Sequence, residues 1–353
     1  MPLPSVPTCA RAVHARRGGW LAAALIVLAL GLLVLGTAVG SMGFETLLPA
    51  LWSPQADPSA HAMAQQIVWD IRLPRTLGAW CAGALLGLAG AVAQGLFRNP
   101  LADPYLLGSA SGASLGVALA LALFGASPLA GAWLTTLGLT GAAFVGAMAA
   151  VLLTLVLARG VQHTLRLLLA GVIVGVVLGA LGSLVTLMVP ETMPAMQAFL
   201  LGSTGFVGWP ACVPMGLAFV LCLATAWTVS PVLDGLTLGE ATARSLGLPL
   251  GPLRLALVAV MALATGAAVA QTGLIAFVGL AAPHLVRSVV RTTHARLVGL
   301  SALAGGVLLL AADLLARSWI APQELPVGVL TAVLGGGYLL WLMYRGRGAK
   351  GAM

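Results

Sequence analysis

The stretch LLLAGVIVGVVLGALGSLVTLMV, from Leu167 to Val189, contains no charged residue and is long enough to cross a lipid bilayer as one helix. Apolar runs of this kind recur along the whole chain of 353 residues, of which 60% are hydrophobic and only 7% are charged. An ordinary soluble domain has about 25% charged residues. So few charges cannot cover a surface that faces water. The sequence therefore predicts an all-α, polytopic membrane protein that is embedded in lipid.

Length and charge divide the chain into ten crossings, with a cytoplasmic tail at each end (residues 1–19 and 346–353) around one membrane domain (20–345). The predicted crossings are residues 20–40, 67–97, 106–124, 129–158, 166–188, 210–230, 254–271, 274–291, 297–315 and 325–344. The uncharged run 192–233 also predicts a short helix before its full crossing. A signal peptide is an alternative for the first run, but that run exceeds the roughly 7–15 apolar residues of such a segment.

The net charge of +8 fits this topology. Fourteen of the 17 basic residues fall on one side, together with both ends of the chain, and the positive-inside rule assigns that side to the cytoplasm. The basic residues stand singly between apolar runs, without interleaved aromatic residues, so the charge does not indicate nucleic-acid binding. Within the opening stretch, Gly171, Gly175 and Gly179 recur every four residues, which predicts close packing of another element along this stripe.

The sequence lacks the usual signatures of catalysis and of a bound cofactor. It has no GxxxxGK[ST] motif for ATP, and its histidines and cysteines show no metal-ligand spacing. The chain is therefore expected to be no enzyme and to bind no cofactor. Ion-coupled carriers usually keep acids or histidines within the membrane. Here Asp313 lies near the outer end of a crossing with Arg317 four residues later, which predicts an ion pair on the helix surface and disfavours a secondary carrier.

The predicted inside loop from Asp234 to Pro249 differs from the other loops. It predicts two short helices joined at a glycine, with Gly247 ending the second. An amphipathic connector at the membrane surface and a segment buried by a protein partner both fit its composition. Another inside segment, from Asn99 to Pro104, predicts a rigid turn in which Asn and Asp side chains cap backbone groups.

Six short motifs resemble the permease subunits of the type II ABC importers for iron chelates and vitamin B12. They are RLPR (72–75), RNPLADP (98–104), YLLGSASG (105–112), LGEATARSLG (238–247), GLIAFVG (273–279) followed by Pro283-His284, and ELPVG (324–328). Their order and spacing extend the similarity over about residues 20–345. The family is known for ten spans, in agreement with the count from length and charge.

The resemblance implies a homodimer of permeases in the cytoplasmic membrane, with two separate ATP-binding cassette subunits inside and a substrate-binding protein outside. ATP would be used by the ATPase subunits alone. The loop near residues 236–250 matches the coupling helices that contact the ATPase. The residues expected to act there are Glu240, Ala243, Arg244, Leu246 and Gly247.

The resemblance also implies roles for isolated residues on the outer and inner sides. Arg72, Arg75 and Arg317 match positions that meet glutamates of the binding protein; interfacial anchoring of a long helix that starts at Leu73-Pro74 is the alternative for the first two. His163 and Thr164 match a region that narrows the path toward the cytoplasm, whereas an exposed loop histidine is the simpler interpretation. The expected cargo is an iron(III) chelate, a siderophore or haem, with a corrinoid as the alternative.

Overall fold

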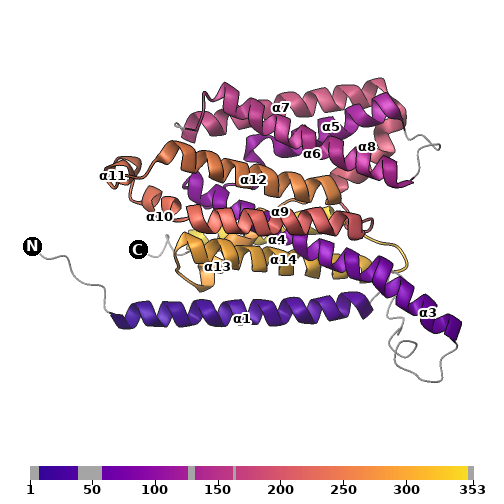
Figure 1. Ribbon diagram of the computed structural model, residues 1–353, viewed down its shortest axis with the longest axis horizontal. Helices are drawn as coiled ribbons and strands as arrows, with labels where there is room; N and C mark the ends of the chain where they lie inside the picture. Colours follow the sequence, from indigo (N-terminus) through magenta and orange to yellow (C-terminus); the bar gives the residue numbers. More distant parts are fainter. Residues whose placement is uncertain (1–7, 39–57, 126–131, 162–163, 349–353) are drawn as a thin grey trace, which may run out of the picture.

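The computed structural model describes residues 8–38, 58–125, 132–161 and 164–348, and these residues form helices without any strand. Figure 1 shows the helices lying side by side along one direction. The α-helices are α1 (Thr8–Ala38), α3 (Pro58–Gln66), α4 (Leu73–Leu96), α5 (Ser109–Phe124), α6 (Ala132–Leu157), α7 (Thr164–Met188), α8 (Met193–Leu201), α9 (Trp209–Val229), α10 (Pro231–Thr237), α11 (Glu240–Ser245), α12 (Leu250–Thr272), α13 (Val278–Val289), α14 (His294–Ser318) and α15 (Val327–Gly348). The all-α prediction is confirmed for this part of the chain.

The two ends of the bundle differ. The short helices α10 and α11 lie at one end, which we name the α11 end. Helix α14 also starts there, and its first residue, His294, contacts Asp234 of α10. The opposite end, where α14 finishes, is named the Asp313 end. As predicted, α10 and α11 are two short helices separated by Gly239, and the short α8 precedes the full-length α9.

Helix α4 runs through the centre of the bundle and is buried on nearly all of its faces between α9, α12, α13 and α14. A helix that is apolar all round is stable only when other helices surround it. Its contact with α14 is close because glycines face each other: a Cβ on Gly83 would lie 2.3 Å from the carbonyl oxygen of Gly305, and the reverse distance is the same. Small residues therefore let these two backbones touch.

A second group, α5, α6 and α7, packs on the far side of α12 (Figure 1). The predicted glycine stripe of α7 belongs to this group. A Cβ on Gly171 would lie 2.1 Å from the Leu106 carbonyl oxygen, so close packing is confirmed there. At Gly175 and Gly179 the nearest atom is the Ser111 hydroxyl at 3.7 Å, an ordinary contact. The stripe thus brings η2 (Pro104–Leu107) against α7 and leaves more space beside α5.

The predicted second crossing of the 254–291 region is only partly helical. Helix α13 has 12 residues, about 18 Å at the rise of an α-helix, against a hydrocarbon core of roughly 30 Å. Residues 273–277 before it are non-helical and buried or partly buried, and Leu274 donates to the Phe199 carbonyl at 3.0 Å. Tyr105 also donates to the Ile275 carbonyl at 3.1 Å. Irregular backbone is stable at membrane depth only when protein groups satisfy it in this way.

Ten crossings is therefore an approximate count. Within the described residues, seven helical stretches are long and apolar enough to span a membrane, while α5 and the Val327–Trp341 part of α15 are shorter apolar stretches. The start of the second crossing, predicted at residue 67, is also corrected, and Leu73-Pro74, the helix start named in the alternative for Arg72 and Arg75, does not begin the helix. A continuous helical segment starts at Pro58 and passes through the π-helical turn η1 (Ile67–Arg72) before Pro74. Pro74 would interrupt a regular α-helix, and the wider π-helical turn directly before it accommodates this proline.

Tryptophans mark the edges of the lipid-facing belt. Trp69 and Trp209 pack together at the Asp313 end with ring centroids 5.3 Å apart, and Trp227 is half exposed near the other end of α9. The eighteen positions from Trp209 to Trp227 correspond to about 27 Å of helix. This length is close to the hydrocarbon thickness, as expected for aromatic belts at both interfaces.

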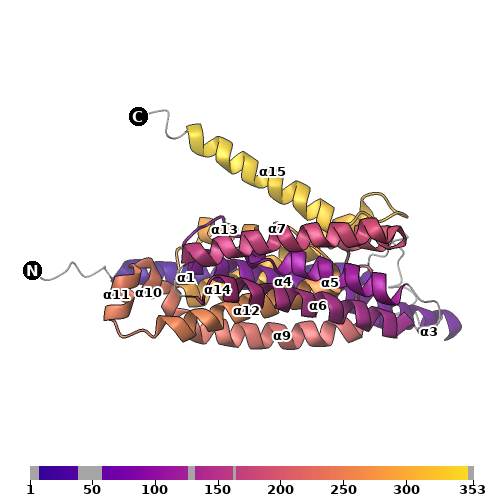
Figure 2. The ribbon, with the colours of Figure 1, turned by 90° about the horizontal axis from the view of Figure 1, so that it is seen from above.

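Helix α15 leaves the bundle at an angle, as Figure 2 shows. It contacts α8, α13 and α14, and an apolar cavity of about 230 Å³ lies between it and α13 and α14. Leu334 and Tyr338 of α15 line this cavity together with Phe277. Large apolar side chains such as Val333 and Leu340 remain exposed on α15.

Candidate functional site

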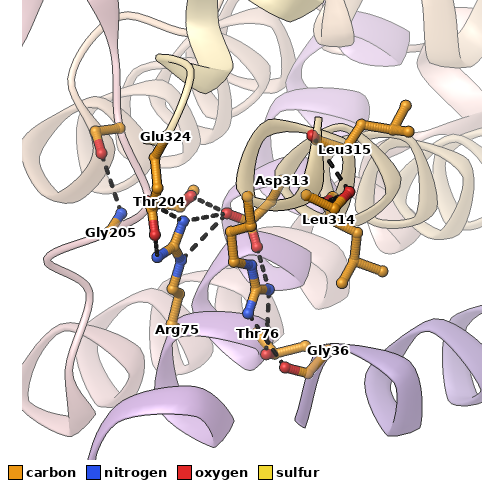
Figure 3. Close-up of polar contacts among 12 residues, drawn as sticks. Gly36, Arg75, Thr76, Thr204, Gly205, Asp313, Leu314, Leu315 and Glu324 are labelled. Atoms are coloured by element: carbon orange, nitrogen blue, oxygen red, sulfur yellow. Dashed lines mark hydrogen bonds and ion pairs between the residues drawn. The ribbon is translucent and has the colours of Figure 1, made fainter. Parts of the chain in front are cut away.

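An ion-pair cluster joins four elements at the Asp313 end (Figure 3). Arg75 of α4 lies between two acids: its Nη1 and Nη2 donate to both oxygens of Glu324 at 2.9 and 2.8 Å, and its Nη2 also donates to Asp313 Oδ1 at 3.1 Å. Thr204 donates to the same Asp313 oxygen, and Arg317 donates to the other one. The cluster therefore ties α4 and α14 to the segments that precede α9 and α15.

The Asp313–Arg317 pair is not on the helix surface. Asp313 and Arg317 do pair, but Asp313 is fully buried and Arg317 is 1% exposed, so the predicted location at the surface was wrong. The Arg317 guanidinium also donates to the Gly36 carbonyl of α1 at 3.1 Å. The helices α1 and α4 flank α14 and cover this ion pair. An i,i+4 spacing within one helix does not show which other helices will cover the two side chains.

The three outer arginines therefore differ in what they offer to a partner. Arg72 is 7% exposed and donates to the last carbonyls of α1, at 2.9 Å to Ala38, where a cation complements the helix dipole. Arg317 is buried as well. Only Arg75 with its exposed neighbour Glu324 reaches toward the surface, with side-chain exposures of 11% and 30%. In this conformation a binding protein could contact the Arg75–Glu324 pair, whereas Arg72 and Arg317 are buried inside the protein.

A larger groove of about 640 Å³ lies between α5, α7 and α8. Its volume is within the range of about 300 to 1,000 Å³ that is typical of small-molecule sites. Hydroxyl and amide groups face it from all three helices, together with small residues and methionines. The polar side chains are those of Ser111, Ser114, Ser183, Thr186 and Gln197.

The α11 end carries the predicted coupling segment, which is held to the bundle by two acids. Asp234 of α10 accepts from the His294 backbone amide at 3.1 Å and contacts its Nδ1 at 2.7 Å, at the first residue of α14. Glu240, the first residue of α11, pairs with Arg254 of α12 at 2.6 Å. Arg98 and Arg244 lie near the same carboxylate at 3.9 and 3.5 Å.

The Glu240 carboxylate is held in its charged form. Burial alone raises the pKa of Glu240, but the hydrogen bond and charge of Arg254, with the charges of Arg98 and Arg244, lower it more. The net pKa of Glu240 lies below its ordinary value. The carboxylate is therefore ionised, and can bind all three arginines, throughout the neutral range.

Most of α11 and the residues beside it face solvent. The Arg244 side chain in α11 is 62% exposed, and Leu238 before the helix and Leu246 after it are 65% and 63% exposed. Gly247 has φ +79, which ends the helix as predicted. Ala243 is fully buried against α10, so it holds α11 in place and presents no surface to a partner.

Two further predictions concern residues 163–164 and the turn at 99–104. His163 is outside the described residues, while Thr164 is the half-buried first residue of α7. The turn at 99–104 is confirmed: Asn99 Oδ1 accepts from the Leu101 amide at 2.9 Å, and Asp103 Oδ1 accepts from the Tyr105 amide at 2.8 Å. Among the described residues, no three His, Cys, Asp or Glu side chains are grouped as metal ligands.

Three partners in these clusters, Arg254, Thr204 and Glu324, were not predicted from the sequence. Arg254 had been counted only as a positive charge on the inner side. Its burial, at 2% exposure, is a signal that no local sequence pattern carries, because the covering residues come from distant segments. Glu324 lies within the ELPVG motif and could have been paired with Arg75 on charge alone.

Comparisons with known proteins agree with this architecture. The FecCD transport family matches residues 23–345. The chain is 37% identical to the hemin transport system permease protein HmuU of Yersinia pestis, over 93% of this chain and 95% of that protein. It is 39% identical to the vitamin B12 import system permease protein BtuC of Salmonella typhimurium, over 96% and 98% of the two chains.

Solved structures agree as well. A metal-chelate type ABC transporter in an inward-facing conformation is 31% identical, with a TM-score of 0.79 over 91% of this chain and 98% of that one. PsaBC from Streptococcus pneumoniae, at 17% identity and a TM-score of 0.58, shares the fold alone. The family match, the relatives and the fold lead to one conclusion: this chain belongs to the FecCD transport family of multi-pass membrane permeases.

Proposed function

We propose that this chain is the membrane subunit of an ATP-driven importer that carries an iron(III) chelate, a siderophore or haem, across the cytoplasmic membrane. The α11 end faces the cytoplasm together with both ends of the chain, and the Asp313 end faces outward. This orientation follows from the basic residues, most of which gather toward the α11 end. Two copies of the chain form the translocation path, with two ATP-binding cassette subunits and an external binding protein as partners.

One observation carries this proposal: a six-residue helix, α11, lies at the end of the bundle between two exposed leucines, Leu238 before it and Leu246 after it. Exposure of the apolar side chains of Leu238 and Leu246 to water is unfavourable, and a protein partner that covers them would remove this exposure. Ion pairs at Glu240 join this helix to the membrane part. A movement of the partner can therefore reach α12 directly, as an ATP-driven permease requires.

The choice of cargo rests on the similar proteins and on the groove. The printed names of the relatives refer to hemin and vitamin B12, and that of the structural neighbour to a metal chelate. The groove between α5, α7 and α8 offers hydroxyl groups and one amide, which suit the polar periphery of a chelate and do not coordinate the metal. An iron chelate is therefore the first candidate and a corrinoid the second.

The proposal is tested by uptake into proteoliposomes that contain this chain with its ATPase subunit, with binding protein outside and ATP inside. Haemin, a ferric hydroxamate and cyanocobalamin are assayed in parallel. We expect uptake of one iron chelate that needs both partners. Uptake of cyanocobalamin alone would identify the second candidate. Ion-driven uptake without any ATPase would overturn the importer and favour a secondary carrier.

A further inference from the structure

The residues that hold α11 against the bundle are few. Ala243 is its one buried residue, and it packs beside α10. Two further links to the transmembrane helices are described: the short connection to α12, in which Leu248 packs on the core, and the carboxylate of Glu240. The direction in which α11 points therefore depends in part on what binds this carboxylate.

Arg254 is the strongest of the three cations at Glu240. Its side chain is 3% exposed and its Nη2 lies 2.6 Å from Glu240 Oε1, whereas Arg98 and Arg244 are 46% and 62% exposed and lie farther away. Water and salt screen exposed pairs much more than buried ones. Removing one partner of a buried pair also leaves the other charge without compensation.

Arg254 also contacts a third segment. Its Nη1 donates to the carbonyl of Val161 at 3.4 Å, three residues before α7 begins at Thr164. The same guanidinium therefore bridges α11 and the connection between α6 and α7. That connection is where the path was predicted to narrow toward the cytoplasm.

Arg254 lies in the first turns of α12, which is 23 residues long and extends about 34 Å. At its other end α12 stops at Gly273, which packs against the Phe199 carbonyl of α8 and leads into the non-helical segment 274–277. A helix of this length moves as a stiff body, so a displacement at Arg254 reaches the broken segment.

We propose that Arg254 is the positioning residue that couples α11 to α12 and to the turn after α6 that contains Val161. In the transporter it converts a movement of the ATPase-bound α11 into movement of the helices that line the path. This inference rests on the proposed function and adds to it a residue outside the coupling loop. Without the Arg254 guanidinium, a movement of α11 reaches α12 only through residues 246–249 and no longer reaches the turn after α6.

The test compares four variants of the complete complex in proteoliposomes: Arg254→Gln, Arg254→Lys, Glu240→Gln and the double variant Arg254→Gln/Glu240→Gln. Arg296→Gln, an exposed arginine at the same end of the bundle, is the matched control. For each, uptake and ATP hydrolysis are measured together, and their ratio is the readout. Haemin, a ferric hydroxamate and cyanocobalamin serve as the transported probes.

We expect Arg254→Gln to lower the ratio of uptake to hydrolysis by about fivefold or more, the usual lower range of coupling between two sites, with hydrolysis changed less than twofold. Glu240→Gln, whose side chain is partly exposed, should fold and give a similar loss. The double variant should be no worse than either single variant, because both remove one contact. Arg254→Lys keeps the charge and should recover part of the ratio.

A ratio for Arg254→Gln within twofold of the wild type would overturn the inference, and so would losses that multiply in the double variant. Equal loss of uptake and hydrolysis in all variants would assign Arg254 a purely structural role. A wild-type complex that imports none of the probes would instead overturn the proposed function itself. If Arg254→Gln fails to assemble, Glu240→Gln and Arg254→Lys decide the question alone.

Discussion

Asp313 in α14 accepts two hydrogen bonds from Arg75 in α4, although 238 positions separate the two residues in the sequence. The carboxylate is fully buried and also accepts from Arg317 and Thr204. Charges in such surroundings are stable only when every partner is in place. The contact therefore fixes how the central helix α4 and α14 meet at the Asp313 end.

Asp313→Asn should destabilise the protein by about 3 to 5 kcal/mol, because it removes the anion that pairs with the buried Arg317 and one of the two acids that pair with Arg75. The measurement is the unfolding midpoint in detergent. Glu191→Gln, at an exposed acid in η3 (Pro190–Thr192), is the control and should change the free energy of unfolding by less than about 0.5 kcal/mol. Equal midpoints for the two variants would contradict the structural role of Asp313.

Glu324→Gln should act mainly on the binding protein. Glu324 is partly exposed and neutralises Arg75, so its removal leaves a positive group facing the approaching acids of a partner. We expect association with the binding protein to become several-fold faster at low salt and the gain to fade as salt is added. Association rates at two ionic strengths measure this effect. Slower association of the variant would argue against docking at Arg75.

Gly90→Ala should prevent correct packing of α4. A Cβ at this position would lie 1.7 Å from the carbonyl oxygen of Gly279 in α13, and a backbone atom cannot move aside without displacing the helix. The expected result is loss of monodisperse protein in detergent. Gly141→Ala, in α6 with nothing near the added Cβ, is the control and should purify like the wild type. Normal yield of Gly90→Ala would contradict the close approach of α4 and α13.

Gly247→Val should uncouple hydrolysis from uptake. Gly247 has φ +79, a conformation that a β-branched residue strongly disfavours, so the end of α11 and the exposed Leu246 must shift. ATP hydrolysis should persist while uptake falls. Gly251→Ala, at an unhindered position in the first turn of α12, is the control and should transport normally. Unchanged uptake by Gly247→Val would remove α11 from the coupling mechanism.

The anchoring of α11 should resist mild acid. The pKa of Glu240 is lowered in the folded protein, so its contribution to stability is complete above the ordinary pKa of glutamate and disappears only as the pH falls through the lowered value. Amide hydrogen exchange of residues 240–247, corrected for intrinsic rates, should therefore show constant protection from about pH 8 to about pH 5. In Glu240→Gln protection should be lower at every pH. Protection that already falls between pH 7 and pH 6 would contradict this account.

The sequence alone predicted the membrane location, the helical class, nearly all helix positions and the two short helices before α12. These features depend on local properties: the length of apolar runs, the placement of charges, and glycine or proline at helix ends. The turn at 99–104 and the end of α11 at Gly247 were predicted for the same reason. The same local reasoning started the second crossing at residue 67, inside a helical segment that begins at Pro58, and treated residues 274–277 as helix.

Only the tertiary structure decided which charges are buried and what they bind. An arginine at the end of an apolar run looks the same in the sequence whether it meets lipid headgroups, a partner or the interior of the protein. Arg317 and Arg254 became internal because α1 and α4 cover the first and the α6–α7 connection reaches the second. The burial of a residue results from contacts between helices that are far apart in the chain. In a membrane these contacts depend on close backbone packing, such as that of Gly83 with Gly305. The hydropathy of the sequence does not show which backbones will pack in this way.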